Sequence, residues 1–237
     1  MNAKELVASV KHWHQDFEVA PGVWTNGSYK PHFWLNWMNL PQRLDGLRVL
    51  EIGSCDGFFT IELARRGAHV VAVDYQPKDQ TGFAVAEKLS GFSFEFHLKN
   101  IYELTVHTAG KFDIVLCLGV LYHLPDPYKA LCIISDCCKI GGSLFIETVA
   151  AELPGVNEPV MRFYKGRSLV GDITNFWTQN PACLVDLTED VGFKVVRTHV
   201  VPSGGAEWTR MSLEAQRVEL VESEQRKSLA YGHWTGF

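Results

Sequence analysis

A glycine turn follows an apolar run near residue 50 and has the features of a ligand-binding loop. The run, Val49–Ile52, includes the acid Glu51 and leads into Gly53-Ser54-Cys55-Asp56-Gly57. A glycine directly after a buried strand permits a tight turn with positive φ and lets a ligand approach the backbone. The next helix is predicted to begin at about Asp56–Phe58, so its unpaired N–H groups face the ligand. These features suit a nucleotide pyrophosphate or the methionyl group of S-adenosylmethionine.

The glycine spacing separates these two ligands. A dinucleotide loop needs G-x-G-x-x-G, but Cys55 and Phe58 stand where the second and third glycines would be, counting from Gly53. The pattern E-x-G-x-x-x-G resembles motif I of the class I methyltransferases, D/E-x-G-x-G-x-G, with Cys55 replacing the middle glycine. A nicotinamide dehydrogenase is therefore the weakest alternative. The resemblance implies that S-adenosylmethionine contacts Glu51, Gly53, Ser54, Cys55 and Gly57.

Polar residues also follow the next two predicted strands. Asp74 comes about 20 residues after the glycine turn, where a carboxylate can accept hydrogen bonds from both ribose hydroxyls of an adenosine. The resemblance implies that Tyr75 lies against one face of the adenine. It also implies that Asn100 and the backbone N–H of Ile101 contact the adenine edge. A strand-end cap and a plain turn are the structural alternatives for Asp74 and Asn100.

A Tyr-His turn follows the fourth predicted strand. Residues 112–127 resemble motif IV of the same superfamily, and Gly119-Val120-Leu121-Tyr122-His123 is similar to the tRNA wobble-uridine carboxymethyltransferase-like family, which also contains many small methyltransferases. His14–Gly27 and Asn175–Pro181 extend that resemblance, which covers about residues 12–217. It places Leu118 and Gly119 at the methionyl ammonium, with Tyr122 beside them.

His123 is a candidate general base, because the unperturbed pKa of histidine lies near neutrality. A helix cap is the structural alternative, and Tyr122 is the second catalytic candidate. Members of that family that use carboxylated S-adenosylmethionine hold the extra carboxylate with several Lys and Arg residues. This chain offers only Lys30 before Arg43 in the corresponding segment. We therefore expect plain S-adenosylmethionine as cofactor and do not carry tRNA over as the acceptor.

The elements that position these residues alternate between strand and helix. Strands are predicted at 48–52, 69–73, 94–98, 112–118, 143–149, 194–201 and 209–216. Helices are predicted at 58–66, 77–89, 127–138 and 181–191, the third closed by Gly141-Gly142. Apolar strands separated by helices predict an α/β fold: a Rossmann-like, seven-stranded, mostly parallel sheet with helices on both faces. Its ligand site lies at the carboxyl ends of the strands.

Two segments fall outside this alternation. Residues 1–46 hold four of the seven tryptophans and are predicted to form an N-terminal cap, and residues 150–180 a lid inserted after strand five. Long connections inside a compact domain are usually functional. The methyltransferase domain is predicted to span 47–217 and a C-terminal tail 218–237. The substrate-side candidates are Trp24, Tyr29, Tyr164, Asn175, Trp177 and Arg210.

Composition limits the remaining function classes. The chain has 237 residues and a net charge of −5, which fits one large domain and disfavours a nucleic-acid-binding surface. Its six cysteines include no C-x-x-C pair, which indicates reduced thiols and a cytoplasmic location. No apolar run reaches the ~18 residues of a membrane span. No third ligand completes the pair His12 and His14, so we expect no metal.

Together these features predict an S-adenosylmethionine-dependent methyltransferase that acts on a small polar molecule, by O-methylation. We expect a monomer or homodimer without membrane partners. Two alternatives stay open at this point: a tRNA wobble-uridine methyltransferase, and a non-catalytic S-adenosylmethionine-binding protein.

Overall fold

The computed structural model describes residues 1–219 and divides the chain into two compact units, Met1–Leu104 and the part from Thr105 onward. Residues 220–237, which hold most of the predicted tail, lie outside the described part. Among residues 1–219, no helix combines the length and apolarity that crossing a membrane requires. The predicted domain boundaries stay a prediction.

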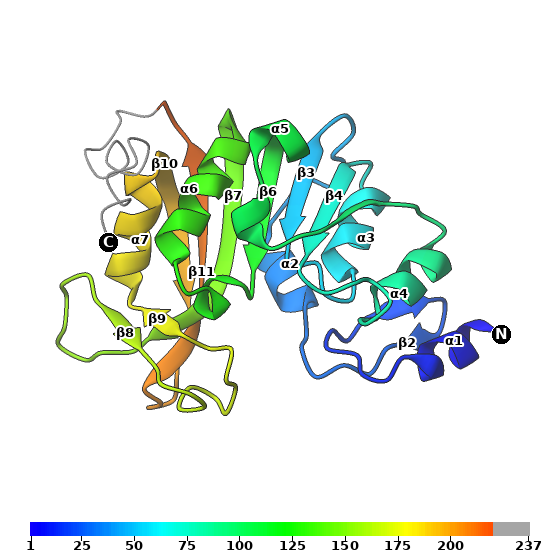
Figure 1. Cartoon of the computed structure of the whole chain (residues 1–237), viewed down its shortest axis with the longest axis horizontal. Helices are drawn as coiled ribbons and strands as arrows, with labels where there is room; N and C mark the ends of the chain where they lie inside the picture. Colours follow the sequence, from blue (N-terminus) through cyan, green and yellow to red (C-terminus); the bar gives the residue numbers. More distant parts are fainter. Residues whose placement is uncertain (220–237) are drawn as a thin grey trace. The chain divides into compact units, whose positions relative to one another are not determined.

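The first unit contains a parallel three-stranded sheet (Figure 1). Its strands are β3 (Arg48–Ile52), β4 (His69–Asp74) and β5 (Glu95–Leu98), in the order β3-β4-β5. β-Branched and leucine side chains favour strands when they are buried on both faces, and Leu50 and Val71 are fully buried. The carboxyl ends of β3 and β4 therefore lie side by side, with the glycine turn after β3 and Asp74 at the end of β4.

The crossover helices of this unit are α3 (Phe58–Arg65) and α4 (Phe83–Ser90). The prediction for α3 is accurate, but α4 begins six residues later than the expected start at Pro77. The segment before α4 forms turns instead. Gly82, directly before the helix, lies so close to Trp13 that a Cβ would be 2.1 Å from the indole ring, so a larger residue there would have to displace Trp13. The helix then leads to β5 and a 3-10 turn, η1 (Ile101–Glu103).

The predicted N-terminal cap contains short regular elements. They are α1 (Ala3–Ser9), β1 (Glu18–Ala20), β2 (Val23–Trp24) and α2 (His32–Met38). β1 and β2 pair antiparallel, and α1 starts with a capping box formed by Asn2 and Glu5. Trp13 and Trp34 are buried, whereas Trp24 is 47% exposed. Two of the four tryptophans of this segment therefore pack into a core.

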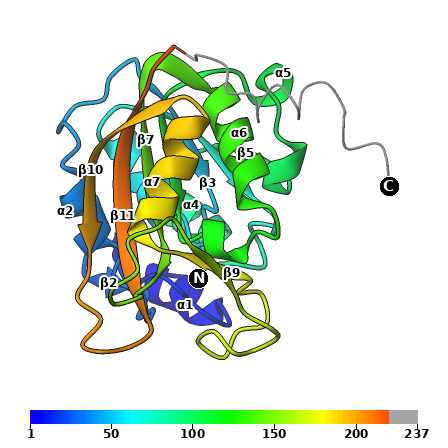
Figure 2. The same cartoon turned by 90° about the vertical axis from the view of Figure 1, so that its left-hand side faces the viewer.

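The second unit contains an antiparallel hairpin joined to a parallel strand pair (Figure 2). Its strand order is β10 (Phe193–Val200), β11 (Trp208–Arg217), β7 (Cys138–Ala151) and β6 (Phe112–Leu118). α6 (Pro127–Cys137) and α7 (Pro181–Asp190) pack against each other and onto these strands, and a short α5 (Val106–Ala109) precedes β6. With β3, β4 and β5 of the first unit, these strands account for all seven that the sequence predicted.

One predicted boundary in this unit is wrong. Gly141-Gly142 do not close α6, because the helix ends at Cys137 and β7 starts at Cys138, so both glycines lie inside the strand. A Cβ on Gly142 would lie 2.9 Å from the backbone oxygen of Asp113. Gly142 therefore allows the backbones of β7 and β6 to approach closely where their register shifts, and it does not cap a helix.

The predicted lid, 150–180, contains two strands that the sequence did not reveal. β8 (Met161–Phe163) pairs antiparallel with β9 (Trp177–Gln179), and β9 pairs with β7 through Gln179 and Ala150. The 3-10 turn η2 (Leu121–His123), which holds the predicted catalytic pair, belongs to the same unit. Part of this segment is therefore hydrogen-bonded to the sheet.

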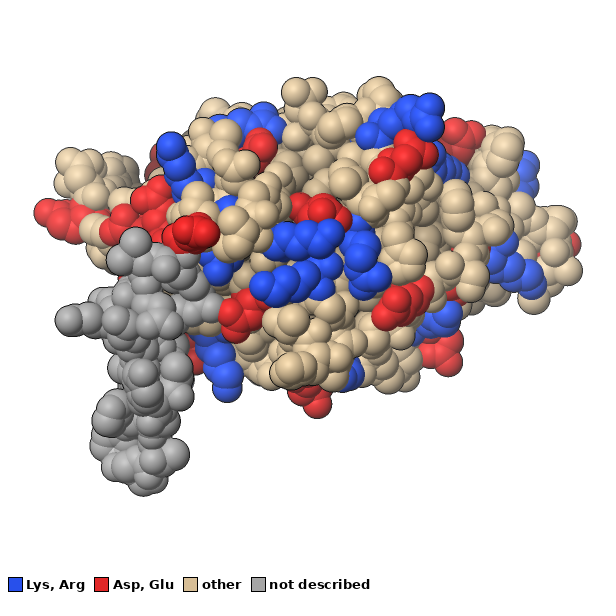
Figure 3. All heavy atoms as spheres, turned by 90° about the horizontal axis from the view of Figure 1, so that it is seen from above, with Lys and Arg blue, Asp and Glu red and all other residues tan. Residues whose placement is uncertain are grey.

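The charged surface is mixed in sign. On the face that Figure 3 draws, one group of Lys and Arg lies near the centre with Asp and Glu at its edges, and the other charged residues are scattered. This face therefore lacks the broad cationic surface that binds a nucleic-acid backbone.

Candidate functional site

The glycine turn after β3 has the left-handed backbone that a ligand-binding loop requires. Gly53 and Gly57 have φ of 78° and 87°, and Cys55 between them has φ of 51°. A left-handed φ is the conformation that glycine adopts without strain. Cys55 therefore keeps the loop shape where the family motif has glycine. The Cys55 backbone N–H donates to Asp74 Oδ2 at 2.8 Å, which connects the turn to the end of β4.

Asp74 lies where the sequence predicted an adenosine-binding carboxylate. Besides the Cys55 N–H, it accepts the Gln76 N–H on Oδ1 at 2.9 Å. Burial raises the pKa of Asp74, and these backbone donors oppose the rise. Tyr75 is a third backbone donor to this carboxylate, and the two oxygens together have about four acceptor sites, so at least one site is left. The first unit therefore aligns the carboxylate with the glycine turn and leaves it acceptor capacity for a ribose hydroxyl.

The predicted adenine contacts follow two neighbouring strands, Tyr75 after β4 and Asn100 and Ile101 after β5, and they differ in exposure. Tyr75 is 68% exposed, so its ring is accessible for stacking on a planar ligand. Asn100 caps η1, where its Oδ1 accepts the Tyr102 N–H at 3.1 Å, and Ile101 is buried. Asn100 thus caps a 3-10 turn, where the alternative reading had a plain turn residue, and a contact with adenine stays a prediction.

Two residues that the sequence reasoning missed fix the glycine turn to the N-terminal segment. The Asp56 carboxylate is buried and accepts the backbone N–H groups of His14 and Gln15 on one oxygen, and of Gly82 on the other, at 2.7–2.8 Å. The Gln15 side chain accepts the Phe58 N–H at 3.0 Å and so caps α3. The acid Asp56 inside the motif was the signal in the sequence, but its partners lie 26 to 42 residues away.

Glu51, the acid of the motif, is a buried carboxyl group rather than an open ligand contact. It is 3% exposed, and Thr60 Oγ1 donates a hydrogen bond to its Oε2. Burial raises its pKa to about 8, which the Thr60 hydrogen bond opposes and the charge of Asp74 reinforces. Glu51 therefore carries a proton at neutral pH.

In the second unit, Tyr122 is held by a buried ion pair. Glu147 on β7 is fully buried, and the Arg210 guanidinium donates to both of its carboxylate oxygens. The same guanidinium lies over the Tyr122 ring, 5.3 Å from its centroid, and donates to the Tyr122 hydroxyl at 3.4 Å. Arg210 was predicted on the substrate side, and Glu147 was not predicted. The geometry makes Arg210 a support for Tyr122.

The two predicted catalytic residues differ in their capacity to accept a proton. Burial raises the pKa of Tyr122 above its ordinary value, so its hydroxyl stays protonated near neutrality. The His123 ring contacts the Tyr122 ring in a tilted arrangement, with centroids 4.1 Å apart, and its Nδ1 lies 2.9 Å from Thr174 Oγ1. His123 is therefore the better candidate base. The Gly119 N–H, predicted near the methionyl group together with Leu118, donates to the Glu147 backbone oxygen at 2.8 Å.

The other substrate-side candidates are distributed over both units. Tyr164 and Asn175 are 8% and 4% exposed, and the Trp177 Nε1–H donates to the Pro125 backbone oxygen at 3.2 Å. In the first unit, Trp24 is exposed and Tyr29 stacks on His14 at 5.3 Å. The structure thus brings Tyr122, His123 and Arg210 together with the lid, but it buries Tyr164 and Asn175.

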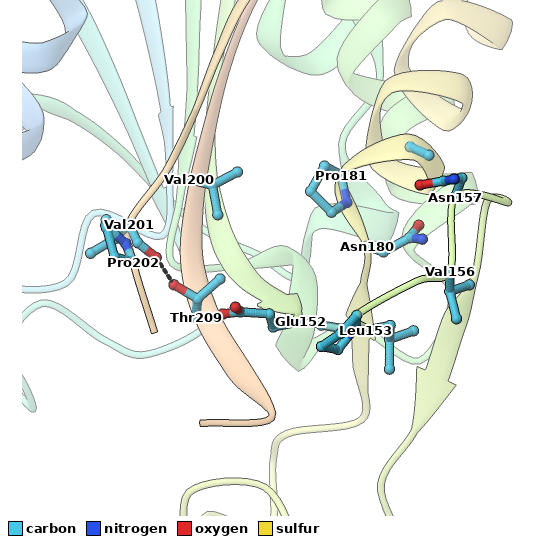
Figure 4. Close-up of a pocket in the computed structure, with 13 residues that line it drawn as sticks. Glu152, Leu153, Val156, Asn157, Asn180, Pro181, Val200, Val201, Pro202 and Thr209 are labelled. Carbon is cyan, nitrogen blue, oxygen red and sulfur yellow. Dashed lines mark hydrogen bonds between the residues drawn. The ribbon is translucent and has the colours of Figure 1, made fainter. Parts of the chain in front are cut away.

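A cavity of about 480 Å³ opens in the second unit (Figure 4). The residues around it come from the ends of β7 and β10 and from the start of α7, among them Glu152, Val200 and Pro181. None of the predicted site residues lines it. Within residues 1–219, no group of three or more His, Cys, Asp and Glu side chains could hold a metal ion. All six cysteines are free thiols.

Comparison with protein families gives one match, to the methyltransferase domain family, over residues 31–198. Among curated proteins, the ubiquinone biosynthesis O-methyltransferase of Aromatoleum aromaticum is 31% identical over 138 residues, which are 56% of this chain and 59% of that protein. Its namesake from Xanthomonas axonopodis pv. citri is 33% identical over 153 residues, 60% of this chain and 64% of that protein. The chain thus spans about three fifths of these relatives.

Solved structures show the same fold at low identity. The N-terminal domain of EvdMO1, with S-adenosylhomocysteine and D-fucose, has a TM-score of 0.67 at 19% identity and covers 90% of this chain and 95% of that one. The [4+2]-cyclase SpnF has a TM-score of 0.64 at 15% identity and covers 91% of each chain. The predicted Rossmann-like α/β fold with a mostly parallel sheet is confirmed. Because a cyclase shares it, the fold alone does not fix the reaction.

Proposed function

We propose that this chain, which belongs to the methyltransferase domain family, transfers a methyl group from S-adenosylmethionine to an oxygen atom of a small polar molecule. The family match confirms the predicted class of enzyme. The finer resemblance to the tRNA wobble-uridine family is not supported by the curated relatives reported above, which are named ubiquinone biosynthesis O-methyltransferases.

The observation that supports S-adenosylmethionine as the methyl donor is the hydrogen bond between the glycine turn and Asp74. A turn with three left-handed residues is bonded to a carboxylate that follows the neighbouring strand, and an exposed Tyr75 comes next. In the same turn, Ser54 Oγ is buried without a hydrogen-bond partner among the described residues. These groups fit an adenosine with an amino-acid tail: Asp74 would hold the ribose, Tyr75 the adenine, and the turn the methionyl group.

The acceptor follows from the groups of the second unit. When bound, S-adenosylmethionine supplies an electrophilic methyl group, so the protein needs to align the acceptor, remove its proton and exclude water. His123 is placed to remove a proton, and Tyr122, fixed by Arg210, forms an aromatic wall next to it. An acceptor hydroxyl, which loses a proton on methylation, matches this pair. The names of the relatives support the same atom.

The alternatives raised by the sequence differ in what they require. A tRNA acceptor requires a cationic surface, and the mixed charges in Figure 3 do not favour one. A non-catalytic binding protein requires no base, yet the predicted base His123 is held by the lid segment through Thr174. A small acceptor with a hydroxyl group is therefore the function that the site supports best.

The test is release of S-adenosylhomocysteine, measured by mass spectrometry, from S-adenosylmethionine and a panel of acceptors. The panel contains phenols and sugar or lipid alcohols, matched amines and carboxylic acids, and unmodified tRNA. We expect release with hydroxyl acceptors only, and loss of release in His123→Gln. Release with tRNA alone, or no release with any acceptor while the cofactor binds, would overturn the proposal.

A further inference from the structure

Within the predicted lid, residues 172–177, which follow β8, are hydrogen-bonded to the Tyr-His turn at several points. The Phe176 N–H donates to the Tyr122 backbone oxygen at 2.8 Å, and the Trp177 indole N–H donates to the Pro125 backbone oxygen. Between these anchors and Asp172, Thr174 contacts the ring of His123. Residues 172–177 are therefore hydrogen-bonded to the Tyr-His turn itself. A segment that only covers the substrate would not need these bonds.

The contacts of Thr174 define which nitrogen of His123 carries the hydrogen. Nδ1 lies 3.2 Å from the Thr174 backbone oxygen and 2.9 Å from its Oγ1. A carbonyl oxygen can only accept, so Nδ1 is the donor. The Thr174 hydroxyl gives its own hydrogen to Asp172 Oδ1 at 2.8 Å, so it also accepts from Nδ1. In the neutral ring, the lone pair is therefore on Nε2.

Asp172 supplies the negative charge at the end of this chain of hydrogen bonds. The Thr174 N–H and hydroxyl both donate to it and lower its pKa, so it stays ionised. Other charged groups belong to the elements packed on the turn and contribute to the field at His123: Arg167 near Asp172, Glu147 of β7, Arg210 of β11, and Asp126 and Lys129 at the start of α6. Of these, Glu147 and Arg210 neutralise each other.

We infer that Asp172 and Thr174 are positioning residues that hold His123 in the Nδ1–H tautomer, so that Nε2 accepts the proton of the acceptor hydroxyl. This inference rests on the proposed function. In the reaction, the O–H bond breaks, its proton bonds to Nε2, and its electron pair stays on the oxygen that bonds to the methyl carbon. The electron pair of the broken C–S bond stays on sulfur. Asp172 then compensates the positive charge of the imidazolium ring through Thr174.

The direct test is a side-chain ¹H–¹⁵N NMR spectrum of the full chain, labelled on histidine, with His123 assigned by its loss in His123→Gln. We expect the Nδ1–H tautomer in the wild type and in Thr174→Ser, which keeps the hydroxyl. Thr174→Val removes the hydroxyl but keeps the backbone oxygen that accepts from Nδ1, so it should raise the fraction of the Nε2–H form without making it the major one. Asp172→Asn should lower the pKa of His123 by about 0.5–1 unit. Asp186 is an exposed acid on α7, and Asp186→Asn is the matched control. It should change neither the tautomer nor the pKa of His123.

Kinetics give the second readout. Thr174→Val and Asp172→Asn should lower kcat by about 10-fold or more, a part of the 10²–10⁴-fold that general base catalysis provides. KM for S-adenosylmethionine should stay within about twofold, and the acidic limb of the pH profile in Asp172→Asn should move to lower pH with the pKa of His123. An Nε2–H ring in the wild type, or a spectrum unchanged in Thr174→Val, would overturn the inference. The spectrum needs no substrate, so an inactive protein with the expected tautomer would contradict only the proposed function.

Discussion

The buried carboxyl group of Glu51 allows a quantitative prediction about stability and pH. In Glu51→Gln, the side chain keeps its size and a carbonyl oxygen for the Thr60 hydroxyl, but it cannot ionise. In the wild type, burial raises the pKa of Glu51 from 4.5 to about 8 in the folded state. The folded protein therefore binds one more proton than the unfolded chain between these two values. Its stability falls as the pH rises through this window.

The magnitude follows from the two pKa values. A rise from 4.5 to about 8 corresponds, at about 1.36 kcal/mol per pH unit, to about 5 kcal/mol. We expect the free energy of unfolding of Glu51→Gln, relative to that of the wild type, to increase by roughly this amount between pH 4 and pH 8. Above pH 8 the difference should stay constant, because Glu51 is then ionised in both states.

Urea unfolding followed by tryptophan fluorescence at half-unit steps of pH measures this difference. Asp79→Asn, which removes an exposed carboxylate from the turns before α4 of the same unit, is the control and should run parallel to the wild type. If the difference between Glu51→Gln and wild type is flat from pH 4 to pH 8, Glu51 is ionised in the fold, and the account of its burial is wrong.

Three further substitutions test how the site is supported. Arg210→Met leaves Glu147 buried without its partner, so urea unfolding should show a loss of about 3–5 kcal/mol; a loss under about 1 kcal/mol would contradict the pairing. Gly82→Ala places a Cβ 2.1 Å from the Trp13 ring, so the free energy of unfolding should fall by about 1–3 kcal/mol, and an unchanged Tm would show that this approach is not tight. Cys55→Gly relieves the positive φ at the middle motif position, so stability should rise by about 0.5–1 kcal/mol with cofactor affinity retained; a clear loss of either would mean that the Cys55 side chain packs in the turn.

The parts of the fold that the sequence predicted are those that local patterns determine. Runs such as Arg48–Ile52 and His69–Val73 are mostly apolar over a strand length; the glycine turn follows the first and Asp74 follows the second. The helices α6 and α7 each start with an Asx cap followed by proline, at Asp126 and Asn180, which fixes their beginnings.

What the sequence did not reveal depends on contacts between distant residues. Gly82, directly before α4, packs against Trp13, and β8 and β9 are three-residue strands that pair with each other. Likewise, Glu147 and Arg210 lie 63 residues apart and His123 and Thr174 lie 51 apart. No periodicity indicates such pairs, so Glu147, Asp56 and Thr174 were absent from the predicted site. The roles of the predicted cofactor and substrate residues stay predictions.

The central claim is that Asp74 and the glycine turn hold S-adenosylmethionine, and isothermal titration calorimetry tests it most directly. We predict that the wild type binds S-adenosylmethionine and S-adenosylhomocysteine at a single site and does not bind NADH. Asp74→Ala should lose about 10-fold or more in affinity, since it removes charge-assisted hydrogen bonds worth about 1.5–3 kcal/mol. Asp79→Ala, at a nearby exposed acid, should bind as the wild type does. Absence of binding to the wild type, or equal affinity in Asp74→Ala, would contradict the account.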